Sequence, residues 1–229
     1  MRGLFVTATD TGVGKTVLSA ALLAAMVAAG EEVRAHKPVV TGLEEPPGAW
    51  PPDHELLASV ANMAPEEVSA LRFGPAVSPH LAAQLAGERI DPADLVARAQ
   101  KAADEKTALI VEGVGGLLVP LTDDYTVCDL AAELGLPVLI AARPGLGTIN
   151  HTLLTLQAAR ATGLEVRAVV LTPWPADPSA LELSNRETIA RMGEIEVEAL
   201  SRVRSLDTAN LAKAGAELPW RHWLDYHTP

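Results

Sequence analysis

A glycine-rich turn near the N-terminus constrains the fold of this chain more than any other segment. The turn, Gly12–Thr16 (GVGKT), follows a short apolar run at Leu4–Val6 and opens an Ala/Leu-rich segment at Lys15–Ala29, with Gly30 as the expected helix stop. A strand, a glycine turn and a helix in that order leave backbone N–H groups of the helix start free to bind an anion. The sequence therefore predicts a phosphate-binding loop.

The side chains of the loop extend this prediction to a nucleotide. Lys15 supplies a positive charge for the outer phosphates, and the hydroxyl of Thr16 can bind magnesium. The strict pattern expects glycine at position 9, where this chain has Thr9. The alternative interpretation is an ordinary glycine-rich turn with a solvated lysine. Strand, turn and helix in the right order favour nucleotide binding.

Three charged residues are expected at the same edge as the loop. Glu112 ends the apolar run Ala108–Val111, and Lys37 ends a second short strand at Glu32–His36. The carboxyl ends of parallel strands meet at one edge of an open sheet, where ligands bind. We therefore predict that Glu112 lies beside the phosphate loop and that Lys37 binds an anion there. For Asp53, which begins a helix, N-capping and magnesium binding both remain possible.

Alternating strands and helices predict a mostly parallel sheet with helices on both faces, in one α/β domain spanning residues 1–229. Further strands are expected at Pro137–Ala142 and Val166–Leu171, with a helix at Thr148–Thr162 between them. Other helices are expected after Pro79 and from Pro92 to about Asp104. Four prolines predict a loop over residues 43–52. The last thirty residues are ambiguous, although Trp220 and Trp223 are expected to pack on the body.

Composition narrows the classes of function. The chain has 229 residues, with 18 Lys and Arg against 29 Asp and Glu, a formal net charge of −11. This acidity argues against nucleic-acid and anionic-membrane partners. The longest apolar stretch, Val17–Ala29, is too short to span a bilayer. The single cysteine, Cys128, cannot form an internal disulfide and is expected in the core, which fits a cytoplasmic protein.

The remaining polar residues give weaker signals. The helix start around Leu146–His151 offers free N–H groups as a second possible anion site. His80 and His151 have no metal-ligand spacing and are interpreted as structural, and Asp123-Asp124 as a solvated turn. No Ser-His-Asp or Cys-His set can be inferred from the sequence.

Five blocks of sequence, taken together, resemble the dethiobiotin synthetase family. They are Thr9–Thr16, His36–Val39 with Thr41-Gly42, Ser78–His80, Val111–Gly116 and Leu146–His151, in the family's order and spacing. The resemblance covers residues 3 to about 192 and implies a P-loop NTPase-like fold. It further implies an ATP- and magnesium-dependent ligase that converts diaminopelargonic acid and CO2 into dethiobiotin, ADP and phosphate through a carbamate and a carbamic-phosphoric anhydride.

The same resemblance assigns roles to residues of this chain. Lys15 and Lys37 would be catalytic. Magnesium would bind Thr16, Asp53 and Glu112. The nucleotide would contact Gly12, Val13, Gly14, Lys15, Thr16, Val17, Asp53, Glu112, Gly113, Val114, Gly115 and Thr172. The diamine would lie near Thr11, Lys37 and Thr41, and its carboxylate would bind Gly147, Thr148 and Asn150 of the neighbouring subunit of a homodimer.

The chain departs from the family pattern at three positions, of which Thr172 and Glu196 are tied to base recognition. Thr172 replaces an asparagine that often reads adenine, Glu196 replaces a proline in a late segment, and Ala8 replaces a glycine before the loop. The base is therefore open, and other nucleoside triphosphates are possible. The rival interpretation is a partitioning-type ATPase switch. Asp10, which stands where that class has a signature lysine, disfavours it.

Overall fold

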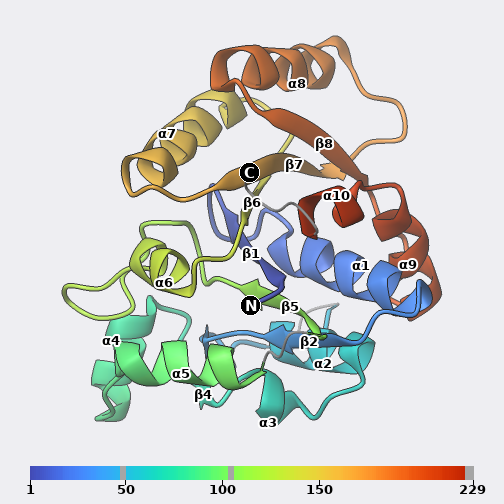
Figure 1. Ribbon diagram of the computed structural model, residues 1–229. Helices are drawn as coiled ribbons and strands as arrows, with labels where there is room; N and C mark the ends of the chain where they lie inside the picture. Colours follow the sequence, from blue (N-terminus) through green and yellow to red (C-terminus); the bar gives the residue numbers. More distant parts are fainter. Residues whose placement is uncertain (47–49, 103–105, 225–229) are drawn as a thin grey trace.

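The computed structural model describes residues 1–46, 50–102 and 106–224 (Figure 1). Within these residues a sheet of six strands has the order β2-β5-β1-β6-β7-β8, and every neighbouring pair is parallel. The strands are β1 (Gly3–Ala8), β2 (Val33–His36), β5 (Ala108–Glu112), β6 (Val138–Ala142), β7 (Val166–Trp174) and β8 (Glu196–Ser201). The predicted parallel sheet is confirmed.

The helices pack on both faces of this sheet (Figure 1). They are α1 (Lys15–Ala28), α2 (Asp53–Ala61), α3 (Pro65–Val68), α4 (Pro79–Ala86), α5 (Pro92–Ala102), α6 (Val127–Leu134), α7 (Thr148–Ala161), α8 (Ala180–Gly193), α9 (Thr208–Ala216) and α10 (Trp220–Leu224). Among the described helices, none is long and apolar enough to cross a membrane.

Alternation along the strands divides the interior into two cores. In β1, Leu4 and Val6 point into the core formed with α1, α2, α9 and α10, whereas Phe5 points into the core formed with α4 to α8. All three side chains are fully buried. Strands buried on both faces are typical of parallel sheets covered by crossover helices, which is why they read as continuous apolar runs.

The C-terminal segment packs on α1 rather than forming a separate unit. An added Cβ at Gly215 of α9 would lie 2.0 Å from the carbonyl oxygen of Ala21, so glycine allows the two helices to touch. Trp223 of α10 is fully buried, and its Nε1 donates a hydrogen bond of 2.9 Å to Oε1 of Glu196. The expected packing of Trp220 and Trp223 on the body is confirmed.

Several boundaries differ from the sequence predictions. The two-residue strands β3 (Val39–Val40) and β4 (Leu71–Arg72) form a small second sheet that was not predicted. Helix α5 is described to Ala102, so its expected end near Asp104 lies outside the described residues, as do residues 47–49 of the proline-rich loop. In the remainder of that loop, residues 43–46 and 50–52 have no helix or strand, as predicted.

Candidate active site

The phosphate loop has the expected strand–turn–helix geometry. β1 ends at Ala8 and α1 begins at Lys15. Gly12 has φ 68° and Gly14, the residue before the helix, has φ 105°. These left-handed values suit glycine, because a Cβ would clash with its own backbone. The glycines predicted from the sequence are therefore required by the path of the loop.

The strand register brings Lys37 and Glu112 together. β2 and β5 are neighbours in which His36 pairs with Val111, so the next residue of each strand leaves the same sheet edge. β5 also pairs with β1, where Val6 is opposite Glu112. The phosphate loop starts just beyond this point. Residues 75 positions apart in sequence thus meet beside the loop.

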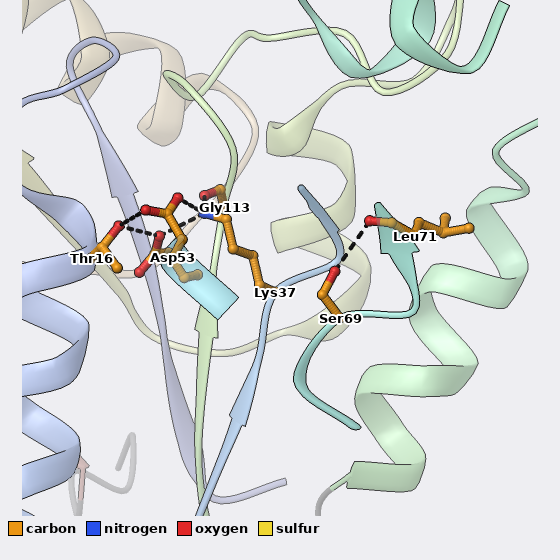
Figure 2. Close-up of polar contacts among 7 residues, drawn as sticks. Thr16, Lys37, Asp53, Ser69, Leu71 and Gly113 are labelled. Carbon is orange, nitrogen blue, oxygen red and sulfur yellow. Dashed lines mark hydrogen bonds and ion pairs between the residues drawn. The ribbon is translucent and has the colours of Figure 1, made fainter. Parts of the chain in front are cut away.

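Four polar side chains from four segments form one cluster at this edge. Figure 2 shows Thr16, Lys37 and Asp53 pointing toward one another. Lys37 Nζ lies 2.6 Å from Oε1 of Glu112 and 2.9 Å from Oδ2 of Asp53. Oγ1 of Thr16 lies 2.8 Å from Oδ1 of Asp53 and 2.9 Å from Oε1 of Glu112. The structure therefore brings together the three residues that the family resemblance assigns to magnesium and Lys37, one of the two that it assigns to catalysis.

The structure excludes one of the two interpretations that the sequence left open for Asp53. The residue before α2 is Pro52, and Asp53 is the first helical residue. Its carboxylate binds Thr16 and Lys37, so the N-capping interpretation is wrong. Burial is the largest influence and opposes the charged form of Asp53, but the charge of Lys37, the hydrogen bonds from Lys37 and Thr16 and the charge of Lys15 together outweigh it and lower the pKa of this carboxyl below its usual value.

Lys37 is a buried and permanently charged group. Burial alone would lower its pKa. The negative charges of Glu112 and Asp53, together with their hydrogen bonds, outweigh burial and raise the pKa of Lys37 well above its usual value. A buried lysine with two carboxylate partners keeps its proton through the neutral range. It is suited to stabilising an anion, not to accepting a proton.

The pKa of Lys15 shifts in the opposite direction to that of Lys37. Burial and the nearby charge of Lys37 lower its pKa to about 8, because its attraction to the carboxylates is too weak to compensate. A triphosphate bound in the loop would add negative charge and raise this pKa again. Lys15 is therefore a cation whose full charge depends on the ligand.

Nucleotide binding is accordingly expected to take up protons in mildly alkaline solution. At pH 8.5 a free Lys15 with pKa about 8 is mostly neutral, so raising its pKa on binding takes up as much as roughly 0.7 proton. Affinity should fall as the pH rises through 8. Calorimetry at pH 8.5 in two buffers of different ionisation enthalpy measures the uptake. Lys15→Met should abolish it and Lys213→Met, on the exposed side of α9, should not; equal uptake in both variants would contradict this origin.

The donor atoms of the cluster fit a magnesium ion. Magnesium prefers hard oxygen ligands such as carboxylates and hydroxyls, which Thr16, Asp53 and Glu112 supply. Oε2 of Glu112 is buried without a hydrogen-bond partner among the described residues. An unpaired buried carboxylate oxygen is costly, and a cation next to it would remove that cost. The chemistry of these residues thus allows the metal site that the sequence suggested.

A pocket of about 610 Å³ lies over the loop and the cluster. Of the residues that the sequence singled out, it is lined by Thr11, Gly12, Val13, Gly14, Lys15, Thr16, Val17, Lys37, Thr41, Asp53, Val114, Gly115 and Thr172. Glu112 is fully buried beneath it, and the carbonyl oxygen of Gly113 accepts a 3.4 Å hydrogen bond from Lys37. Most of the expected nucleotide and substrate residues therefore share one cavity.

The expected carboxylate-binding residues are not brought into this pocket. Gly147 has φ 89° and immediately precedes α7, Thr148 is buried as its first residue, and Asn150 is exposed on its first turn. None of the three lines the pocket. Within the described single chain they lie outside the pocket around Lys37, and their assignment to a neighbouring subunit stays a prediction.

The structure places Glu196, one of the departures from the family pattern, away from the pocket. Glu196 begins β8 and pairs with Ala168, at the opposite end of the strand from the pocket, where it accepts the hydrogen bond from Trp223. Its link to base recognition is therefore wrong. Instead, the pocket is lined at the end of β8 by Ser201, Arg202 and Val203. A single sequence without an alignment could not fix which residues of β8 reach this end.

Two further residues near the loop were missed by sequence reasoning. Trp50, about half exposed, lines the pocket from the proline-rich loop. Arg143, just after β6, donates hydrogen bonds to carbonyl oxygens of the phosphate loop. An isolated tryptophan in a loop carries no periodic pattern. For Arg143 the only signal was its place after a strand that ends at the ligand-binding edge.

The fold and the loop define the class of the protein. Residues 2–210 match a family model described as an AAA domain. The cell-division ATPase MinD of Pyrococcus furiosus has a TM-score of 0.56 at 16% identity, covering 95% of this chain and 98% of that one. McdA of Cyanothece in complex with ATP has a TM-score of 0.55 at 11% identity, covering 100% and 99%. At such identities the likeness shows the fold alone: the chain is an α/β protein with a phosphate-binding loop, as predicted.

Curated relatives identify the family within that class. The chain is 46% identical to the ATP-dependent dethiobiotin synthetase of Anaeromyxobacter sp. strain K, covering 87% of this chain and 89% of the relative. It is 39% identical to the synthetase of Mycobacterium sp. strain KMS, covering 98% of both, and 35% identical to that of Anoxybacillus flavithermus, covering 86% and 90%. The chain belongs to the dethiobiotin synthetase family, as its motifs indicated.

Proposed function

We propose that this chain is an ATP-dependent ligase that closes the ureido ring of dethiobiotin from diaminopelargonic acid and CO2. Membership of the dethiobiotin synthetase family supports this function. The single structural observation that carries it is Lys37, a buried cation held by Glu112 and Asp53 beside the phosphate loop. A phosphoryl acceptor that is itself an anion needs a fixed positive charge at this place.

The reaction requires three bond-forming steps. One amine nitrogen bonds to the carbon of CO2 and loses a proton, which gives a carbamate. A carbamate oxygen then attacks the γ-phosphorus of ATP, ADP leaves, and a carbamic-phosphoric anhydride forms. The second amine attacks the carbamate carbon and loses its proton, phosphate leaves, and the ring closes. None of these steps needs a nucleophilic side chain, which agrees with a site built from cations and backbone amides.

The residues of the pocket would have different roles in these steps. Gly12–Gly14 and Lys15 would hold the phosphates, and Lys37 would stabilise the carbamate and the transferring phosphoryl group. Thr11 and Thr41, which line the same pocket, would orient the diamine. Magnesium held by Thr16, Asp53 and Glu112 would neutralise charge on the outer phosphate oxygens. The ends of β7 and β8 at Thr172 and Arg202 would face the base, and other nucleoside triphosphates remain possible substrates.

A homodimer would place the carboxylate site of one chain next to the diamine site of the other. Leu118 and Leu154 are 63% and 55% exposed and line a groove of about 390 Å³ that also contains Thr11. Leu146, directly before the expected carboxylate site, is 93% exposed. Large apolar side chains that are exposed in the single chain favour burial against a partner. A second copy of this chain supplies both the apolar surface and the missing anion site.

Leu146→Asp is therefore expected to weaken the dimer and the binding of the diamine together. A charge buried in a desolvated interface costs several kcal/mol, so sedimentation should show a shift to monomer and the KM for the diamine should rise about tenfold or more. Leu85→Asp, on the exposed side of α4, is the matched control and should change neither. A monomeric unmodified enzyme with full activity would contradict the shared site.

Release of ADP tests the proposed function. The purified chain is mixed with ATP, magnesium, bicarbonate and diaminopelargonic acid, and ADP is measured as each component is omitted in turn. We expect release of ADP only in the complete mixture, because the carbamate is the phosphoryl acceptor. Release of ADP at the same rate without the diamine would favour a simple ATPase.

A further inference from the structure

Arg143 binds the phosphate loop without lining the pocket. The residue follows β6, the neighbour of β1 in the sheet. Its Nη2 donates hydrogen bonds of 3.2 Å to the carbonyl oxygen of Thr11 and 3.3 Å to that of Gly12. An added Cβ at Gly12 would lie 3.5 Å from the same nitrogen. One guanidinium nitrogen thus contacts two consecutive peptide groups of the loop.

These contacts determine where the amide hydrogens of the loop point. A trans peptide is planar, so its C=O and the N–H of the following residue point in opposite directions. With the carbonyl of Thr11 turned to Arg143, the N–H of Gly12 points away from Arg143. The same argument aims the N–H of Val13 away from it. Gly12 and Val13 both line the pocket, where amides that point away from Arg143 can meet the phosphates.

The segment after Arg143 is anchored as well. Asn185 of α8 is buried, and its Nδ2 donates hydrogen bonds of 2.8 Å to the carbonyl oxygen of Pro144 and 3.1 Å to that of Gly145. A buried side-chain amide with two backbone acceptors fixes the path of the chain that it binds. Arg143 therefore extends to the loop from a rigid base formed by β6 and α8.

We propose that Arg143 is a positioning residue that orients the Gly12 and Val13 amides for binding of the triphosphate. The proposal rests on the nucleotide site of the proposed function. Flipping either peptide would turn an amide out of the pocket and a carbonyl oxygen toward the phosphates, where it would repel them. A guanidinium stays charged at all working pH values and adds positive potential beside an anion site. Its effect should act through phosphates and be independent of the base.

Calorimetry with Arg143→Met tests this role, with Arg143→Lys and Arg98→Met as comparisons. Methionine keeps an unbranched apolar side chain but removes the donors, whereas lysine restores a charged donor. Arg98 is an exposed arginine paired with Asp94 on α5 and serves as the control. Loss of two charge-assisted hydrogen bonds to the loop is expected to weaken ATP binding about tenfold in Arg143→Met. Arg143→Lys should recover most of the affinity and Arg98→Met should bind as the unmodified chain does.

The outcomes separate this proposal from the proposed function. An equal fold-loss for ATP, GTP and CTP, with an unchanged melting temperature, supports Arg143 as a positioning residue. Binding of ATP within twofold of the unmodified chain, or a loss that tracks a lower melting temperature and is not rescued by lysine, overturns it while leaving the nucleotide site in place. An unmodified chain that binds no triphosphate overturns the site itself, and the role of Arg143 with it.

Discussion

Replacing Lys37 by methionine is expected to reduce ring closure by about a thousandfold or more while the chain still binds nucleotide. Removing a single preorganised group that stabilises developing charge typically costs a factor of about 10²–10³ in rate. Lys37 would act on the carbamate and again on the transferring phosphoryl group, so we place its loss at the upper end. Steady-state release of ADP in the presence of the diamine measures the effect, and calorimetry measures nucleotide affinity.

The Lys37→Met variant needs a control for loss of stability, because Lys37 neutralises a buried carboxylate. Breaking one side of a buried ion pair typically costs about 3–5 kcal/mol, so thermal unfolding should show a destabilised chain. Magnesium should recover part of that stability by taking over the charge of Glu112. Lys213→Met on the exposed side of α9 provides a matched lysine replacement without this effect. Normal turnover by Lys37→Met would show that Lys37 has no catalytic part.

Glu112→Gln is expected to remove most of the magnesium-dependent activity. Glutamine has the same shape but only one acceptor oxygen and no charge, so it is a poor ligand for magnesium and no longer neutralises Lys37. A loss of about a hundredfold or more in rate is expected, together with a higher magnesium concentration for half-maximal rate. The measurement is a magnesium titration of diamine-dependent release of ADP.

A second glutamate of the sheet provides the control. Glu196 is partly buried, whereas Glu112 is fully buried, and Glu196 is also hydrogen-bonded, but to Trp223 at the opposite end of β8. Glu196→Gln should keep the magnesium dependence of the unmodified chain. If Glu112→Gln needed no more magnesium than Glu196→Gln, the assigned metal site would be in the wrong place.

The sheet could be predicted from sequence because its strands are buried on both faces. Runs such as Ala108–Val111 and Pro137–Ala142 are apolar throughout, with Gly113 two residues beyond the first and Pro144 two residues beyond the second. Strands of this kind with helices between them almost always form right-handed parallel crossovers. The carboxyl ends of the strands then share an edge, which is enough to predict from sequence that Lys37 and Glu112 lie close together.

Short or half-exposed elements could not be predicted in the same way. Strands β3 and β4 have two residues each, below the length at which alternation can be read. Helix α6 owes its start to Thr126, whose side-chain oxygen accepts a hydrogen bond from the backbone N–H of Asp129 and whose backbone N–H donates one to the carboxylate of Asp129. Such a local cap is visible only when the following helix is already known.

In the site too, the arrangement of the strands could be predicted from the sequence, whereas side-chain contacts between loops could not. The strand ends fixed which segments meet, so Lys15, Lys37 and Glu112 could be placed from order alone. Side-chain contacts across loops, such as that of Arg143 with Thr11, depend on the path of each loop and carry no periodic signal. For Asp53, helix start and ligand both fitted the sequence, and only its contacts with Thr16 and Lys37 decided between them.

Mass spectrometry of the product with ¹³C-bicarbonate tests the central claim most directly. The chain, ATP, magnesium, diaminopelargonic acid and labelled bicarbonate are incubated, and the product is weighed and quantified against ADP. The predicted result is dethiobiotin heavier by one mass unit than the unlabelled compound, formed in equal amount to ADP. Release of ADP without labelled dethiobiotin would contradict the claim that the phosphoryl group at Lys37 drives closure of the ring.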